Sequence, residues 1–322
     1  MPCEVLAARA AEELQMSPLI IDTDIGVDDA VALRYALLTQ DLIGITCTYG
    51  NVAVEQAVKN AKALCRHYGV SQPVFKGASR PLSRRPLPLE SHIHGHDGLG
   101  DYVTFPENST APDAVHYLIE SAWHYRGELT LCTIGPLTNL ALALNLCPEL
   151  PSLLKEVIIM GGAFGSNGYG GNMTHFAEFN ILNDPEAAEL VLASTLNLVL
   201  IPLDVTMQVQ ISGEEIARLK DEFLRGITAF YLDFYLKRGG SAGMAVHDAL
   251  TVSYLNNPGW YQTVTTPLTV SLGGPTDGQT LRPLGRLNVP HDVFAGRPEH
   301  KLCLGVQVAE VKEHLLKTLR LQ

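Results

Sequence analysis

Short apolar runs alternate with longer amphipathic stretches along most of the chain. Runs of this kind, bounded by turn-forming residues, are expected for strands that are buried on both faces of a parallel sheet. They occur at residues 19–21, 42–49, 73–76, 129–134, 156–160 and 197–203. The stretches between them predict helices, at residues 54–68, 114–125 and 140–146. The alternation predicts an α/β fold with a mainly parallel central sheet and helices on both faces.

The last third of the chain continues the pattern less regularly. Ser212 and Glu215 form a capping box for a helix that we expect to run to about residue 223. Further helices are predicted at residues 227–237, after residue 248 and at residues 311–321, and strands at residues 268–272 and 303–308. No repeat, low-complexity tract or Ser-rich linker divides the chain. We therefore predict one domain over residues 18–322, preceded by an extension at residues 1–17.

Four carboxylates follow the first predicted strand, at Asp22, Asp24, Asp28 and Asp29. Side chains alternate along an extended chain, so Asp22 and Asp24 share one face, while Asp28 and Asp29 open the next helix. Acids this close repel one another unless a cation neutralises them or some are protonated. An oxygen-only set favours Ca²⁺ or Mg²⁺ over zinc. The alternative, helix capping and turn hydrogen bonds, would suffice for an isolated pair of acids, but four at a strand-to-helix junction favour a metal site.

Composition and charge narrow the classes of partner. The formal net charge of -11 argues against a nucleic-acid partner, which requires a basic surface, and fits a small neutral substrate. The six cysteines have no zinc-like spacing and are expected to be reduced thiols of a cytoplasmic protein. Residues 1–17 lack the pattern of a secretory signal or transit peptide, and no apolar stretch approaches the ~20 residues of a membrane span.

Polar residues also follow other predicted strands. Asn51 comes directly after the second strand, and a long loop at residues 79–100 could act as a lid. That loop contains His92, His94 and His96. Their spacing could indicate a transition-metal site, but no helical or zinc-finger context accompanies it, so a histidine that faces the substrate is the preferred interpretation.

A glycine-rich segment follows the strand that ends at Met160. It contains no G-x-G-x-x-G phosphate fingerprint at the strand end, so a dinucleotide fold is poorly supported. Asn172 and the run Glu178, Phe179, Asn180 come next. If the run is extended, Glu178 and Asn180 point the same way and suit a polyhydroxylated ring. A polar edge strand with Phe179 in the core is the alternative.

Three separated motifs resemble those of one known family. They are DTDIGVDDA at residues 22–30, GPLTNLA at residues 135–141 and the pair His247-Asp248. Together they are similar to the nucleoside hydrolases of the inosine-uridine preferring type, whose fold is α/β and Rossmann-like. Two positions depart from the usual family pattern, with Ile25 in place of proline and Met207 in place of a histidine.

The resemblance implies a calcium site and a set of catalytic roles. Asp24, Asp29, Asp248 and the backbone carbonyl of Thr138 would bind one Ca²⁺ ion. Asp28 would take a proton from a water molecule on the metal, and His247 would act as the acid for the leaving base. His94 matches the family's HG-containing segment.

The resemblance also implies a ribose-binding pocket. Asn51, Asn172, Glu178 and Asn180 would hold the ribose hydroxyls, and Phe179 and Met160 would line the pocket. The implied activity is hydrolysis of ribonucleosides, with His247 favouring the nonspecific or pyrimidine-preferring type. The preferred base stays open, and we expect a homodimer or homotetramer.

Two other functions fit part of the sequence. A phosphotransferase of the haloacid dehalogenase type also begins with Asp-x-Asp after a strand, but the downstream Thr and Lys motifs that it needs are missing. A non-catalytic nucleoside- or ribose-binding protein could retain the calcium site. Asp28 and His247 argue against it, because binding alone requires neither a base nor an acid.

Overall fold

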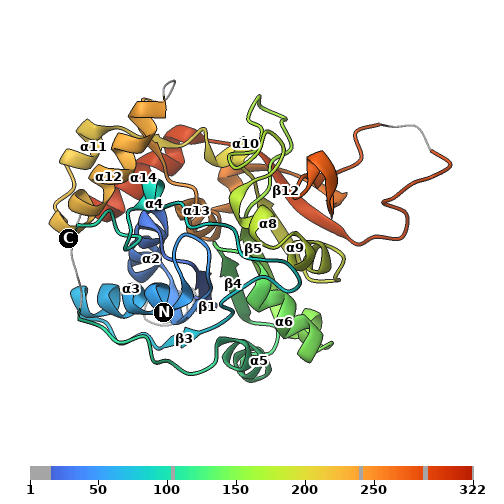
Figure 1. The fold of residues 1–322 in the computed structure, drawn as a ribbon, viewed down its shortest axis with the longest axis horizontal. Helices are drawn as coiled ribbons and strands as arrows, with labels where there is room; N and C mark the ends of the chain where they lie inside the picture. The colour runs from blue at the N-terminus through green and yellow to red at the C-terminus, as the bar shows by residue number, and fades with distance from the viewer. Residues whose placement is uncertain (1–15, 103–105, 239–241, 286–288, 321–322) are drawn as a thin grey trace, which may run out of the picture.

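The central feature of the fold is an eight-stranded sheet with the order β3-β2-β1-β4-β5-β6-β12-β9 (Figure 1). The computed structural model describes residues 16–102, 106–238, 242–285 and 289–320. The predicted extension at residues 1–17 lies outside the described residues except for Met16 and Ser17. The strands of the sheet are β1 (Pro18–Thr23), β2 (Asp41–Cys47), β3 (Val74–Lys76), β4 (Leu129–Thr133), β5 (Leu154–Met160), β6 (Leu198–Ile201), β9 (Tyr261–Pro267) and β12 (Glu299–Val306). All neighbouring strands are parallel except β9 and β12, which confirms the predicted fold class.

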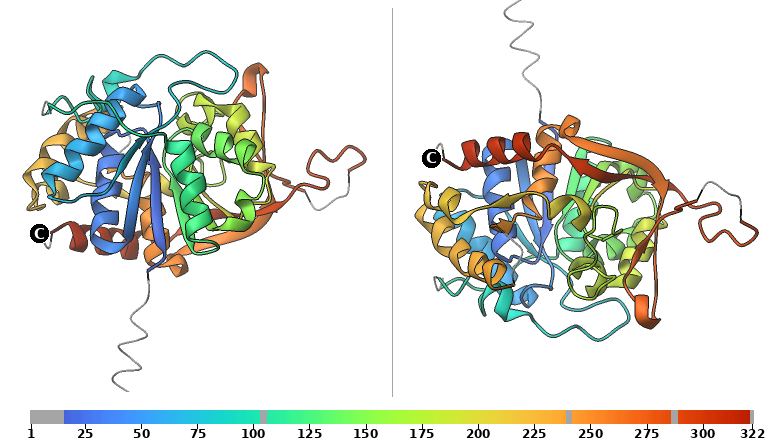
Figure 2. Two further views of the ribbon diagram at one scale, coloured as in Figure 1. Left: turned by 90° about the horizontal axis from the view of Figure 1, so that it is seen from below. Right: turned by 90° about the horizontal axis from the view of Figure 1, so that it is seen from above.

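Helices cover both faces of the sheet, as Figure 2 shows. Successive residues of β1 enter different cores: Leu19 and Ile21 belong to one apolar cluster and Ile20 to the other. This alternation is the period of two that a strand imposes on its side chains. The first cluster packs α2 (Val27–Thr39), α3 (Val54–His67), α12 (Glu222–Arg238), α13 (Ala249–Asn256) and α14 (Val308–Arg320) on one face. The second packs α5 (Ala114–His124), α6 (Thr138–Leu146), α7 (Leu150–Leu153) and α9 (Pro185–Leu192) on the other.

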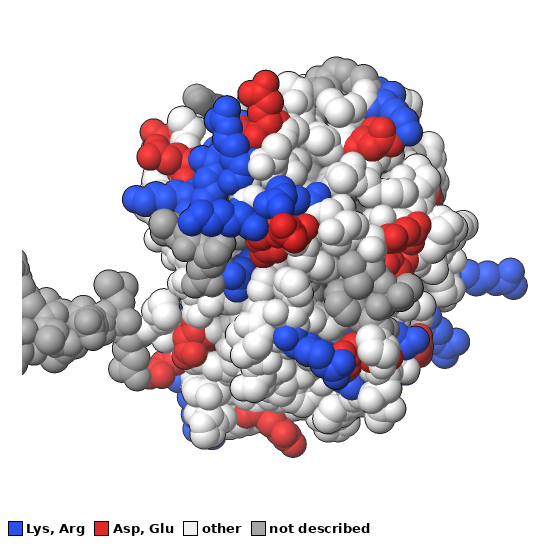
Figure 3. Space-filling view, turned by 90° about the vertical axis from the view of Figure 1, so that its left-hand side faces the viewer, with Lys and Arg blue, Asp and Glu red and all other residues white. Residues whose placement is uncertain are grey.

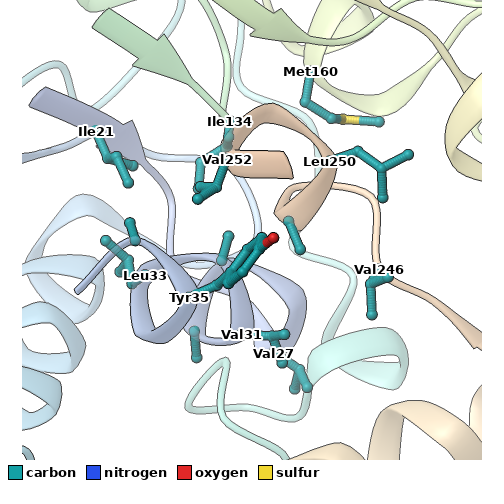
Figure 4. Close-up of a cluster of buried hydrophobic side chains, with 14 of the residues drawn as sticks. Ile21, Val27, Val31, Leu33, Tyr35, Ile134, Met160, Val246, Leu250 and Val252 are labelled. Carbon is teal, nitrogen blue, oxygen red and sulfur yellow. The ribbon is translucent and has the colours of Figure 1, made fainter. Parts of the chain in front are cut away.

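The first core packs together two helices that are far apart in the sequence, α2 and α13. Figure 4 shows Val27 and Val31 of α2 in the same buried cluster as Leu250 and Val252 of α13. Asp28 and Asp29 lie in the first turn of α2, and Asp248 directly precedes α13. The apolar contact between these helices therefore places the three acids at one point.

Smaller elements connect the layers. They are α4 (Ser91–His94), α8 (Phe179–Asn183), α10 (Leu203–Thr206), α11 (Gly213–Ala217), β7 (Gln210–Ile211), β8 (Met244–Ala245), β10 (Thr269–Val270), β11 (Thr280–Leu281) and the 3₁₀ turns η1 (Pro258–Trp260) and η2 (Gly274–Thr276). None of the helices among the described residues is long and apolar enough to cross a membrane. On the face shown in Figure 3 acidic side chains lie beside the basic ones. Among the ion pairs of the described residues, Lys312 Nζ lies 2.8 Å from Glu215 Oε2.

The structure differs from the sequence prediction at three places in the second half. The capping box of Ser212 and Glu215 is present, but its helix ends at Ala217 and α12 starts at Glu222. The strand predicted at residues 268–272 shortens to β10, which pairs with β11 outside the main sheet. β9 was not predicted, because its middle residues are polar and exposed and so leave no apolar pattern.

Candidate metal and substrate site

The acids predicted to bind a metal lie together at the carboxyl ends of the central strands. Asp24, Asp28, Asp29 and Asp248 are all buried. One carboxylate oxygen from each of Asp28, Asp29 and Asp248 lies within 4.8 Å of the others. Asp24 is adjacent, since the Asn51 amide donates to both Asp24 Oδ1 (3.2 Å) and Asp29 Oδ2 (3.1 Å). The cluster offers only oxygen ligands, which suits a hard divalent cation.

The loop between β1 and α2 holds these acids through short contacts. Asp29 accepts hydrogen bonds from the Gly26 amide (2.8 Å) and the Thr23 hydroxyl (2.5 Å). Ile25, which replaces the proline usual in the resembling family, has a φ of 24°. Proline fixes φ near -65°, so this turn is one that proline could not adopt.

Gly50 permits the close approach of β2 to the cluster. Its φ is +156°, and a Cβ atom there would lie 1.9 Å from Asp24 Oδ2. The next amide, that of Asn51, donates to the same carboxylate oxygen at 2.7 Å. A side chain at position 50 would thus displace a predicted metal ligand.

Burial and mutual repulsion hold protons on the cluster. Burial, together with repulsion from Asp29, raises the pKa of Asp28 to about 8. The same two causes raise the pKa of Asp24 well above its usual range, while Asp28 is the main charged neighbour that raises the pKa of Asp248. A bound cation would remove both costs. The residues present therefore fit a metal ion.

The same shifts predict how the metal-free protein responds to pH. Burial also raises the pKa values of Asp22 and Glu178 to about 7. Between pH 6.5 and 8.5 the unfolded chain would have these carboxyls ionised, whereas the folded protein still binds protons on them. Stability must therefore fall as pH rises through this window. The buried histidines His94 and His247, whose pKa values are lowered, change their protonation below this pH window and do not alter the trend.

We expect the Tm of chelator-treated protein to fall by several degrees from pH 6.5 to 8.5, and calcium to reduce that fall, because it stabilises the ionised acids. Differential scanning calorimetry at both pH values, with and without calcium, measures the effect. A Tm that stays constant or rises with pH in chelator would contradict it.

A cavity of about 400 Å³ opens beside the acids. Its wall contains most of the residues predicted from the sequence. They are Asp28, Asn51, His94, Met160, Asn172, Glu178, Phe179, Asn180, His247 and Asp248. Asp24 and Asp29 lie behind this wall, in contact with Asn51.

Thr138 does not line the cavity. It is the first residue of α6, and its hydroxyl donates to Asp184 at 2.8 Å. Ile134, at the end of β4, does line the cavity, and its carbonyl accepts a hydrogen bond from Asn180 Nδ2 at 3.1 Å. Thr138 as the backbone ligand therefore stays a prediction, and Ile134 is the residue at the end of β4 that reaches the cavity.

Residues 178–180 do not form one extended segment, contrary to the prediction, because Phe179 and Asn180 belong to α8. Glu178 caps α8 instead, and its carboxylate accepts from the amides of Asn180 (2.9 Å) and Ile181 (3.1 Å). A helix of five residues is too short to show a helical period in the sequence. Both polar side chains nevertheless reach the cavity wall.

The three histidines of the loop at residues 91–96 separate in the structure. His94 is buried, accepts from the Val27 amide at Nδ1 (3.1 Å) and stacks on Tyr231 at 4.8 Å. His92 and His96 are exposed, and His92 lies 3.2 Å from Glu90. The contacts favour the interpretation of His94 as a substrate-facing residue over a shared transition-metal site.

His247 is held on both ring nitrogens. Its Nδ1 lies 2.7 Å from the Thr206 hydroxyl and its Nε2 lies 2.7 Å from the Tyr235 hydroxyl. Burial lowers the pKa of His247 to about 4 and that of His94 to about 3. Both imidazoles are therefore neutral near pH 7 in the metal-free protein.

Helix α12 supplies one wall of the cavity that the motifs did not identify. Tyr231, Phe234, Tyr235 and Arg238 line it, together with Ile93 and Met207. No motif contains Tyr231 or Tyr235, and their spacing of one helical turn is the only sign in the sequence that they share a face. The Tyr231 hydroxyl lies 3.5 Å from Asp28 Oδ2, so α12 contacts the acid cluster directly.

Known proteins with similar sequences are nucleoside hydrolases. The model of the inosine-uridine preferring nucleoside hydrolases matches residues 19–313. The pyrimidine-specific ribonucleoside hydrolase RihB of Escherichia coli O9:H4 is 34% identical over 295 residues, which cover 88% of this chain and 93% of that protein.

Solved structures agree in fold. A plant nucleoside hydrolase, PpNRh1, superposes with a TM-score of 0.88 at 28% identity and covers 95% of this chain and 99% of its own. A purine-preferring ribonucleoside hydrolase from Gardnerella vaginalis has a TM-score of 0.85 at 33% identity and covers 94% of this chain and 98% of its own.

Proposed function

Because the chain belongs to the inosine-uridine preferring nucleoside hydrolase family, we propose that it hydrolyses the N-glycosidic bond of ribonucleosides in a calcium-dependent reaction. The products are ribose and the free base. The observation that carries this proposal is the set of buried acids at one end of a cavity whose other walls hold amides, a glutamate and two histidines.

Calcium is the ion proposed for the acid cluster. Asp24, Asp29 and Asp248 supply carboxylate oxygens, and Ca²⁺ accepts six to eight oxygen ligands, more than these residues offer. We assign the backbone ligand to the Ile134 carbonyl in place of Thr138, since Ile134 faces the cavity. When bound, the ion would hold the ribose diol and lower the pKa of a water molecule.

Asp28 is the proposed proton acceptor. It lines the cavity beside Asp29 and Asp248, and its second oxygen contacts the Tyr231 hydroxyl. The neighbouring His94 Nδ1 lies 3.9 Å from Asp28 Oδ1 but is already occupied by the Val27 amide. Asp28 is thereby oriented into the cavity, where a water molecule that attacks the sugar carbon would give up its proton.

The remaining polar walls suit the ribosyl group. Cleavage of the bond leaves positive charge on the ring, which nearby carboxylates stabilise. Glu178 and Asn180 are fixed by their own hydrogen bonds, so they are ready to bind ribose hydroxyls without rearranging. Asn51 and Asn172 complete this set, while Met160 and Phe179 contribute apolar contact.

His247 is the proposed acid for the leaving base. Because the imidazole is neutral at pH 7, one ring nitrogen can give a proton to the base only as the other accepts one, and the hydroxyls of Tyr235 at Nε2 and Thr206 at Nδ1 are placed for such a relay. The relatives include one named as pyrimidine-specific and another named as purine-preferring. A nonspecific or pyrimidine-preferring activity is our proposal on the basis of His247.

The test is reducing-sugar release from inosine, uridine, cytidine and adenosine, with and without a calcium chelator. We expect calcium-dependent release of ribose, and the rates with the four nucleosides will show which base is preferred. Calcium binding without any release would support the alternative of a nucleoside-binding protein and would contradict the proposed reaction.

A further inference from the structure

The glycine-rich loop after β5 forms a wall of the substrate cavity, of which the proposed reaction uses only Asn172. Residues 168–173 of this loop line the cavity. Tyr169 is the only one of these six residues with an aromatic side chain. It is half-buried, and among the described residues its ring and hydroxyl have no hydrogen-bond or ring partner. An aromatic ring in this position is free to contact a bound molecule.

The first half of the loop is fixed by Asp204 of α10. This carboxylate is buried and accepts hydrogen bonds from the amides of Phe164 (2.8 Å) and Ser166 (2.5 Å). Asn167 Nδ2 donates to the carbonyl oxygens of Asp204 and Leu304, each at 3.0 Å. Hydrogen bonds to a charged carboxylate are stronger than those between neutral groups. Helix α10 and strand β12 therefore hold this half of the loop in place.

The second half of the loop packs against the turn that follows it. The Gly171 amide donates to the His175 carbonyl at 3.1 Å. A Cβ atom at Gly170 would lie 2.6 Å from the same carbonyl oxygen. A Cβ atom at Gly171 would lie 2.3 Å from the Ala177 carbonyl oxygen. No side chain fits at either position, so the backbone is held on both sides of Tyr169 and its ring has a defined place in the cavity wall.

The loop contacts α12, the helix beside the proposed position of the leaving base. Arg238 Nη2, at the end of α12, donates to the Asn172 carbonyl at 3.4 Å. His247 Nε2 lies 2.7 Å from the hydroxyl of Tyr235 in the same helix. A base that receives a proton from His247 therefore lies beside α12, while its ribose lies on the buried acids. Tyr169, three residues before Asn172, is placed to cover the base.

We propose that Tyr169 is a specificity-determining residue whose ring packs on the base of the bound nucleoside, and that Asp204 positions it. This inference rests on the proposed function, which defines the ends of the cavity that hold the ribose and the base. Every nucleobase has a flat π face, so stacking on an aromatic ring accepts any base. A purine offers more ring area than a pyrimidine. Tyr169 therefore extends the accepted substrates to purine nucleosides.

Asp204→Asn tests whether the position of the loop matters for this contact. The amide group of asparagine would turn an NH₂ group toward one of the two loop amides that Asp204 holds, so the loop should shift and KM for inosine should rise. In the double variant with Tyr169→Ala, KM should be no higher than in Tyr169→Ala alone, because Asp204 acts through Tyr169. Additive increases in KM would contradict the positioning role.

Steady-state kinetics of Tyr169→Ala with inosine and uridine tests the contact itself. Stacking binds the ground state and the transition state alike, so its loss raises KM and leaves kcat nearly unchanged. We expect KM for inosine to rise ~10-fold or more and KM for uridine to rise less, whereas Tyr169→Phe retains both values. Phe176→Ala, the matched control, removes an exposed aromatic side chain that does not line the cavity and should change neither. A lower kcat with unchanged KM would overturn the inference.

Equilibrium binding separates this inference from the proposed reaction. In an Asp28→Asn background with calcium, isothermal titration calorimetry measures the Kd values of inosine and ribose without turnover. Adding Tyr169→Ala should raise the Kd of inosine ~10-fold or more and leave that of ribose unchanged. This result would support the inference even if the parent protein released no ribose from nucleosides. Equal weakening of inosine and ribose, or normal hydrolysis with unchanged KM in Tyr169→Ala, would overturn the inference and leave the proposed reaction intact.

Discussion

Replacing Asp29 with alanine is expected to abolish both calcium binding and ribonucleoside hydrolysis. Asp29 lies between Asp24 and Asp248, so its loss removes one ligand and weakens the negative field of the others. We expect kcat/KM for inosine or uridine to fall by ~10³-fold or more, equivalent to about 4 kcal/mol of transition-state stabilisation. Isothermal titration calorimetry would measure the loss of calcium binding alongside the kinetics.

Two further variants separate loss of the metal from damage to the fold. Asp29→Asn keeps the shape of the side chain and can still accept from the Gly26 amide, so it should lose calcium while retaining the Tm of the chelated parent protein. Asp28→Asn should retain calcium but lose turnover, because Asp28 is the proposed proton acceptor. Retained activity of Asp29→Ala at trace calcium would contradict the metal site.

Replacing His247 with alanine is expected to slow hydrolysis in a way that depends on the leaving group. General acid catalysis is worth ~10²–10⁴ in rate, and the loss should appear in kcat for uridine and inosine. A p-nitrophenyl riboside, whose leaving group needs no proton, should be hydrolysed nearly as fast as by the parent enzyme. Steady-state kinetics on both substrates gives the comparison.

The control for this variant is His116→Ala, which removes an exposed histidine on α5 remote from the cavity lining. It should leave both substrates unaffected. An equal loss on both substrates by His247→Ala would indicate a structural role, through the contacts with Thr206 and Tyr235, and would remove His247 from the acid role.

The parts of the fold that the sequence predicted are those with a strong local pattern. β1 and β4 are buried throughout, and β1 and β5 contain the apolar runs at residues 19–21 and 157–160, so their positions follow from hydrophobicity. β9 escaped prediction because an exposed edge strand has no such requirement. The break between α11 and α12 was predicted too late, after about residue 223 instead of after Ala217, since the charged residues around it are compatible with a longer first helix.

The site residues that could be predicted are likewise those with a local sequence pattern. Short motifs identified the acids of the β1–α2 loop and the His247-Asp248 pair, since each motif is contiguous. The wall supplied by α12 depends on tertiary packing, and Phe234 and Arg238 belong to no motif. The backbone ligand was assigned to Thr138, whereas the cavity is lined by Ile134. Any amino acid can supply a carbonyl group, so only coordinates reveal which one faces inward.

The contact between α2 and α13 has a consequence for biosynthesis. Asp28 and Asp29 leave the ribosome early and Asp248 late, yet the three acids meet only when α13 packs on α2. Long-range contacts of this kind form late in folding, after their loop-closure entropy has been overcome. The nascent chain would therefore have no assembled ion site until its final quarter has been synthesised. Acquisition of tight calcium affinity should then coincide with completion of the core rather than with formation of the first βα unit.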